Sequence, residues 1–204
     1  PTVNAPPDVT VDATGLLTVV DLGMATGSDG NDGAVNIFKA AVDLSPAEIA
    51  ALEDSVTGCD VFANYETDIK PFRPGRHVVT WASCDSSGNT GHDEQTVNVR
   101  PLVGVKDGQT IGEGQTVTID VSLNGKAIAY PASVGYAISG TATVGVDHDA
   151  VSGTVVFTDP DVLVESLSFN INTDAIAEAD ETVVITLYSP VNLALGSNKV
   201  HMVT

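Results

Sequence analysis

The feature that most constrains the fold is the recurrence of short apolar runs, about one every ten residues, separated by Gly, Asp, Asn and Pro. In the first half of the chain, the clearest runs are residues 9–11, 16–20, 78–81 and 96–99. Apolar and polar residues alternate within such runs, which is typical of half-buried β-strands. The chain is therefore predicted to be all-β and built from antiparallel β-sandwiches.

One segment of the first half interrupts this pattern. Ser45-Pro46-Ala47-Glu48 has the form of a helix capping box with proline at the first helical position, and apolar residues follow it up to Leu52. We expect a short helix here, inserted between strands of the first sandwich.

The dipeptide Arg100-Pro101 marks the predicted domain boundary, because a strand pattern ends there and a new one opens at Val103. A chain of 204 residues is long enough for two ordinary domains. We expect two tandem immunoglobulin-like sandwiches, residues 1–101 and 102–204. The short connection between them favours a spacer over freely moving domains.

The charge balance excludes several classes of partner. The chain has 8 basic and 27 acidic residues and a net charge of −19, so nucleic acids and anionic membranes would be repelled. A solvated acidic surface would account equally well for this charge. No run of 18 apolar residues exists, so no membrane insertion is expected. The sequence has no signal peptide and stops within a strand-like run, so we expect a piece of a larger protein.

The two cysteines, Cys59 and Cys84, both lie in the first half. A disulfide between them would contribute about 3 kcal/mol in the chain-entropy model and would fit an oxidising compartment. The alternative is a pair of unlinked, buried thiols.

A dense group of acids lies near the C-terminus, between the strand-like runs 167–171 and 183–187. Its members are Asp174, Glu178, Asp180 and Glu181. Carboxylates this close repel one another unless a cation lies among them, and oxygen ligands on a β-loop suit Ca²⁺ above all. The other interpretation is that these acids only cap strands and keep a loop soluble.

Three further segments, together with these acids, form a family pattern. They are 112–123 (GEGQTVTIDVSL), 140–149 (GTATVGVDHD) and 152–157 (SGTVVF). In this order, from about residue 103 to the end, the chain resembles a Calx-β domain. The resemblance implies an antiparallel sandwich of immunoglobulin-like shape that binds calcium at one end through interstrand loops.

The same resemblance implies a set of calcium ligands: Glu113, Asp147, Asp174, Glu178 and Glu181, with Asp180 as a neighbour. The chain departs from the family at three points. His148 stands in a tyrosine position, Thr173 replaces one of two paired aspartates, and a final run of aspartates is absent. Fewer charged ligands imply weak binding, with a Kd of ~10⁻⁴–10⁻³ M. Calcium is expected in the intact protein and could be absent from this fragment.

The first half has a looser resemblance. Residues 72–90 (FRPGRHVVTWASCDSSGNT), followed by the run 96–99, resemble the end of a hyalin-repeat (HYR) domain. Cys84 comes earlier than the family's usual cysteine, and residues 34–70 do not follow the pattern. The resemblance implies an extracellular spacer or interaction module.

Catalysis is not predicted, because the chain has no nucleophile elbow, no His-Glu-x-x-His and no phosphate loop. We expect a non-catalytic, calcium-stiffened adhesion or structural module of a larger secreted or cell-surface protein, bacterial and extracellular. Its partners would be neighbouring domains and a surface protein or polysaccharide, and the fragment would be monomeric. The alternative is an accessory carbohydrate-binding module of a secreted hydrolase, although aromatics make up only 5% of the chain.

Overall fold

The computed structural model describes all residues except 32, 44–46, 48–70 and 174–178. Its described residues form strands and connecting loops, which confirms the all-β prediction. They divide into two compact units. The first unit contains residues 1–11 and 17–99, and the second contains 12–16 and 100–204.

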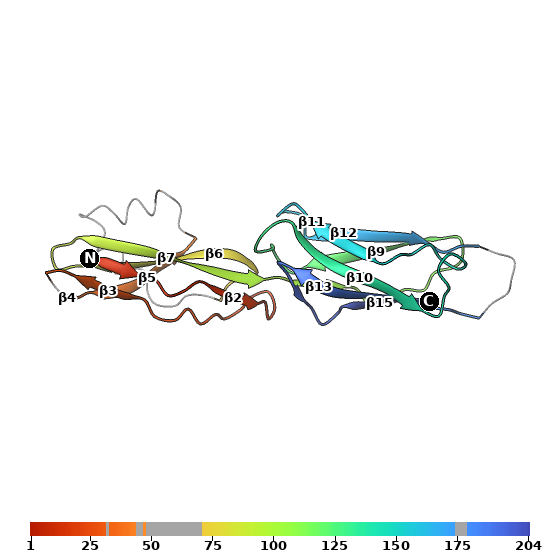
Figure 1. Ribbon diagram of the computed structural model, residues 1–204, viewed down its shortest axis with the longest axis horizontal. Helices are drawn as coiled ribbons and strands as arrows, with labels where there is room; N and C mark the ends of the chain where they lie inside the picture. The colour runs from red at the N-terminus through yellow and green to blue at the C-terminus, as the bar shows by residue number, and fades with distance from the viewer. Residues whose placement is uncertain (32, 44–46, 48–70, 174–178) are drawn as a thin grey trace. The chain divides into compact units, whose positions relative to one another are not determined.

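The first unit has a three-stranded sheet in the order β1-β3-β4 and a four-stranded sheet in the order β2-β7-β6-β5 (Figure 1). The strands are β1 Thr2–Asn4, β2 Val9–Asp12, β3 Thr26–Asp29, β4 Gly33–Ala34, β5 Asn36–Val42, β6 Gly75–Cys84 and β7 Thr90–Arg100. The expected helix at 45–52 lies outside the described residues except for Ala47.

The core of the first unit lies under β6 and β7. Val79 and Trp81 are buried, as the alternation along this strand predicted, and Val97 of β7, the partner of His77, is buried on the same side of the sheet. The two strands are joined by a hairpin in which the Asp85 carboxylate accepts hydrogen bonds from the backbone N–H groups of Ser87 and Asn89. Asp85 and Asn89 therefore shape a turn.

The bond between Cys59 and Cys84 stays a prediction, and Cys59 lies outside the described residues. Cys84 is the last residue of β6 and is half-buried. We expect the native protein to resist alkylation and the reduced, unfolded protein to take up two alkyl groups, measured by intact mass. Alkylation of both thiols without reduction would show that the bond is absent.

The second unit is a sandwich of two four-stranded sheets in the orders β11-β10-β13-β15 and β12-β9-β8-β14. All neighbours are antiparallel except the short pair β8 and β14. The strands are β8 Leu102–Val105, β9 Thr116–Leu123, β10 Ala132–Gly140, β11 Gly153–Phe157, β12 Val164–Asn170, β13 Val183–Val191, β14 Ala194–Leu195 and β15 Val200–Val203.

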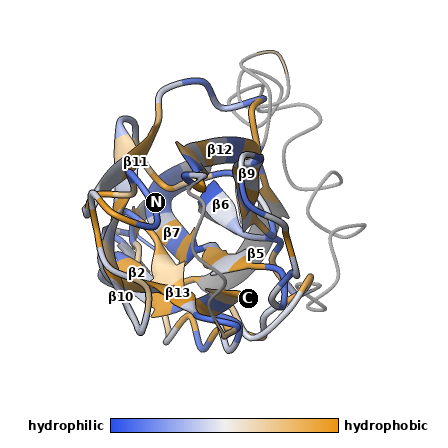
Figure 2. Cartoon of the chain, turned by 90° about the vertical axis from the view of Figure 1, so that its right-hand side faces the viewer, coloured by the Kyte–Doolittle hydropathy of each residue, from blue (hydrophilic) through white to orange (hydrophobic). Residues whose placement is uncertain are grey.

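Strict alternation builds the core between these two sheets. In β9, residues Val117, Ile119 and Val121 are almost fully buried while their neighbours are exposed. Phe157 and Ile185 enter the same core from the other sheet. Figure 2 shows the alternation as orange and blue segments along the strands. Among the described residues, no helix is long and apolar enough to cross a membrane.

Candidate metal centre

A cavity of about 260 Å³ lies at one end of the second unit. It is formed by the segment before β9, the loop between β10 and β11, the chain after β12, the start of β13 and the end of β15. Apolar side chains such as Ile111, Ile171 and Val183 contribute to its lining together with carboxylates. Those carboxylates belong to Glu113, Asp147, Asp180 and Glu181.

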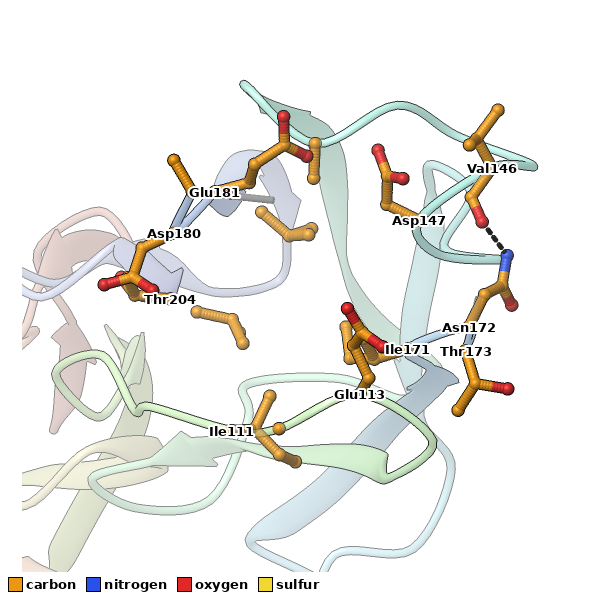
Figure 3. A pocket seen from close by; sticks show the side chains of 15 residues that line it. Ile111, Glu113, Val146, Asp147, Ile171, Asn172, Thr173, Asp180, Glu181 and Thr204 are labelled. Atoms are coloured by element: carbon orange, nitrogen blue, oxygen red, sulfur yellow. Dashed lines mark hydrogen bonds between the residues drawn. The ribbon is translucent and has the colours of Figure 1, made fainter. Parts of the chain in front are cut away.

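Three of the five predicted ligands therefore line one cavity, although they are far apart in sequence. Figure 3 shows Glu113, Asp147 and Glu181 projecting from three different segments around the same space, with the Asp180 carboxylate turned away from them. The other two predicted ligands, Asp174 and Glu178, lie outside the described residues.

Asp147 is held by a compact loop, residues 141–151. Its Oδ2 accepts a hydrogen bond from the Thr143 backbone N–H at 2.6 Å, and its own N–H donates to the Thr143 carbonyl at 2.9 Å. Gly145 has a φ of +83°, a conformation that favours glycine, and its N–H donates to the His148 carbonyl. The Oδ2 atom of Asp147 therefore takes part in a hydrogen bond within the loop. Oδ1 is the second oxygen of this carboxylate.

The Asp147 loop is fastened to the chain that follows β12. The backbone N–H of Asn172 donates to the Asp147 carbonyl at 2.8 Å, and the Asn172 side chain donates to the Val146 carbonyl. The position of Asp147 therefore follows from pairing with a distant segment. Asn172 and Thr173 also line the cavity, and sequence reasoning did not assign them to the site. Both residues directly precede the acidic stretch, and this position in the sequence could have indicated that they belong to the site.

His148 occupies the position where the Calx-β pattern has tyrosine. Its side chain is buried, and its Nδ1 accepts a hydrogen bond from the Ala150 backbone N–H at 3.1 Å. The ring packs edge-on against Phe169, with ring centroids 6.1 Å apart. The histidine ring thus supports the loop from inside the sandwich, as the ring of a tyrosine would.

Asp149 ties the other end of this loop to β12. Its two carboxylate oxygens accept hydrogen bonds from the backbone N–H and the side-chain amide of Asn170, at 2.6 and 2.8 Å. The backbone hydrogen bond, followed by the side-chain one, lowers the pKa of Asp149. A carboxylate with a lowered pKa in the folded state stabilises the fold above its unfolded pKa of about 3.9, and this contribution is lost at lower pH.

We therefore expect the stability of the second unit to fall more steeply below pH ~4 in the wild type than in Asp149→Asn. The measurement is the urea midpoint of each protein between neutral and acidic pH. Asp107→Asn, at an exposed position, is the control and should keep the wild-type pH dependence. Identical profiles for wild type and Asp149→Asn would contradict this role.

Glu113 reaches the cavity from a segment that crosses the end of the sandwich. The Ile111 N–H donates to the Thr204 carbonyl at 2.9 Å, and the Gly114 N–H donates to the Ile171 carbonyl at 3.1 Å. Gly114 has a φ of +73°, so the turn directly after Glu113 favours glycine. This explains why a glycine directly follows the glutamate.

The donor set is composed of oxygen atoms, which suits a hard cation. Among the described residues, however, no three His, Cys, Asp or Glu side chains are grouped closely enough to hold a metal ion. The described carboxylates thus surround a shared cavity without forming a finished coordination sphere. Oxygen-bearing residues of this type fit a divalent cation in their chemistry.

Comparison with known proteins identifies the family. The Calx-beta domain model matches residues 91–203, and the chain therefore belongs to the Calx-beta family. No curated protein matches the chain. The hyalin-repeat resemblance of the first half stays a prediction.

Three solved structures are similar to about half of the chain. The apo-form Calx CBD1 domain is 23% identical over 51% of this chain and 96% of that chain, with a TM-score of 0.44. CBD12 from CALX1.2 is 25% identical over 50% of this chain and 43% of its own, with a TM-score of 0.45. The calcium binding domain CBD12 of CALX1.1 is 26% identical over 52% and 43%, with a TM-score of 0.43.

Proposed function

We propose that the second unit binds Ca²⁺ at the acidic cavity. The observation that carries this proposal is the convergence of Glu113, Asp147 and Glu181 from three distant segments on one cavity, in a chain of the Calx-beta family. Asp174 and Glu178 complete the proposed ligand set from the sequence. Asn172 and Thr173 line the same cavity and carry further oxygen atoms.

Calcium would act by neutralising charge. Without a cation, carboxylates that share one cavity repel one another, which raises the free energy of the folded state. A bound divalent cation converts this repulsion into attraction and links the segments before β9, after β10 and before β13. We propose that this end of the sandwich is thereby stiffened, with a Kd of ~10⁻⁴–10⁻³ M, in the range of extracellular modules.

The wider role we propose is that of a non-catalytic structural or adhesion module in a larger secreted or cell-surface protein. The net charge of −19 supports a solvated, extracellular setting and disfavours nucleic acid as a partner. The absence of catalytic motifs from the sequence supports a binding or mechanical role. Neighbouring domains of the same protein are the partners this role requires.

The test is thermal unfolding with added Ca²⁺ or Mg²⁺. A ligand at ten times its Kd stabilises the folded state by about 1.4 kcal/mol, so Ca²⁺ should raise the Tm of the second unit by a few degrees. Mg²⁺ should act less, because it gives up its waters reluctantly. Glu181→Gln should reduce the rise, while Asp159→Asn, which does not line the cavity, should not. Equal shifts with both cations, retained in Glu181→Gln, would contradict a specific site.

A further inference from the structure

The two sheets of the second unit present very different outer faces. On the sheet containing β9 and β12, outward residues form polar cross-strand pairs, such as Thr118 with Ser168 and Asp120 with Ser166. On the other sheet, the residues of β10, β11, β13 and β15 that alternate away from the core include no Asp, Glu, Lys or Arg. We call this surface the β10 face.

Four exposed apolar side chains lie on the β10 face. Val156, Tyr188, Val200 and Met202 each expose between 43% and 49% of their surface. The cross-strand partners of these four residues are small or uncharged: Ser133 for Val156, Gly135 for Tyr188, Thr186 for Val200 and Val184 for Met202. The β10 face is therefore an uncharged, partly apolar surface on a chain of net charge −19.

Tyr188 lies flat on this face. A Cβ atom built on Gly135 would lie 2.8 Å from the Tyr188 Cζ and 3.0 and 3.2 Å from the two Cε atoms. Cζ and the two Cε atoms form the hydroxyl-bearing half of the ring, and their similar distances indicate that this half covers Gly135 with its face. The opposite face of the ring is turned outward, and 47% of the residue's surface is exposed.

The backbone next to Tyr188 is irregular. Two residues of β13, Ser189 and Pro190, lie between the partners of Ser133 and Gly135, which forms a β-bulge. Ser189 has a φ of +45°, a conformation that costs a non-glycine residue free energy. Bulges of this kind redirect the adjacent side chain and occur preferentially at functional sites.

We propose that the β10 face binds a neutral polysaccharide, with Tyr188 as the stacking platform. The exposed face of an aromatic ring carries negative charge density, and the apolar C–H groups on one face of a pyranose ring complement it. The absence of charged side chains matches a neutral ligand, while the acidic chain would repel an anionic one. A second copy of the chain, with the same net charge, would be repelled likewise.

The test is native affinity electrophoresis of the full chain through gels containing a neutral polysaccharide (hydroxyethylcellulose, xyloglucan, laminarin or dextran) or the anionic alginate. At least one neutral gel should retard the wild type. Tyr188→Phe should keep the retardation, and Tyr188→Ala should weaken it about tenfold, the size expected for an aromatic stacking contact. Gly135→Ala should also weaken it, because the new methyl group displaces the ring from the sheet.

Two controls separate this proposal from packing and from calcium. Val164→Ala removes an equally exposed apolar side chain from the other sheet and should bind as the wild type does. A chelator should leave retardation unchanged, so a failed calcium proposal would not affect this one. The proposal is overturned if no neutral gel retards the wild type, if Tyr188→Ala binds normally or if only alginate, an anionic polymer, gives retardation. It is also overturned if light scattering shows a dimer that Tyr188→Ala dissociates.

Discussion

Replacing Gln95 by leucine is expected to lower the free energy of unfolding of the first unit by about 3–5 kcal/mol. Gln95 is almost completely buried at the centre of β7. Its Oε1 accepts a hydrogen bond from the Trp81 indole N–H at 3.2 Å. Its Nε2 donates to the carbonyls of Pro7 and Leu22 at 2.7 and 3.0 Å. Leucine has a similar volume but takes a hydrogen-bond partner from two buried groups, the Trp81 indole N–H and the Leu22 carbonyl, and from the less buried Pro7 carbonyl. Each buried group left without its partner costs about 1–3 kcal/mol.

Trp81 is the only tryptophan of the chain and lies in the first unit, so its fluorescence during urea unfolding reports that unit alone. The control is Asn98→Ala, which removes a more exposed amide from the same strand and should change stability by less than about 0.5 kcal/mol. If Gln95→Leu unfolds at the wild-type urea concentration, the buried hydrogen bonds do not hold the first unit together.

The second prediction is that the second unit loses stability when residues 12–16 are removed. These residues belong to the second unit although they precede most of the first. The Asn124 side chain donates to the Gly15 carbonyl at 2.8 Å, and the Ala13 N–H donates to the Arg100 carbonyl at 2.9 Å. Separate fragments 1–101 and 102–204 are predicted to fold. The second fragment lacks these partners, so we expect it to be about 1–3 kcal/mol less stable than the same unit in the full chain.

Calorimetry of the full chain and of fragment 102–204 measures this difference. Asn124→Ala in the full chain should reproduce part of the loss, because it removes both the bond to Gly15 and the bond from the Leu102 N–H to its Oδ1. A fragment as stable as the intact unit would show that residues 12–16 contribute nothing. A fragment that does not fold at all would contradict the predicted independence of the two halves.

The parts of the fold that the sequence predicted are those that depend on local alternation. Val117, Ile119 and Val121 are buried as the period-two pattern requires, because each strand must place its apolar side against the opposite sheet. The role of Gln95 could not be predicted, since its partners Pro7 and Leu22 are 88 and 73 residues away. Nothing in the local sequence distinguishes a buried glutamine from an exposed one.

The residues of the candidate site likewise divide into those that the sequence could assign and those that depend on distant partners. The carboxylates Glu113, Asp147 and Glu181 could be assigned from conspicuous segments of a family pattern, and the fold brings them to one cavity. Asn172 could not be assigned, because its importance comes from hydrogen bonds to Val146 and Asp147 across the end of the sandwich. Tyr188 was missed for a related reason, since only the register places its ring over Gly135.

The most direct test of calcium binding is an NMR titration of the chain with Ca²⁺ up to ~10 mM, a range that covers the weak sites of extracellular modules. We predict saturable shifts of the backbone amides of residues 112–114, 145–147 and 179–181, with a Kd of ~10⁻⁴–10⁻³ M. The shifts should weaken in Glu113→Gln and Asp147→Asn and persist in Asp159→Asn. Amide signals that ignore Ca²⁺ over this range, or that respond equally in all three variants, would falsify the account.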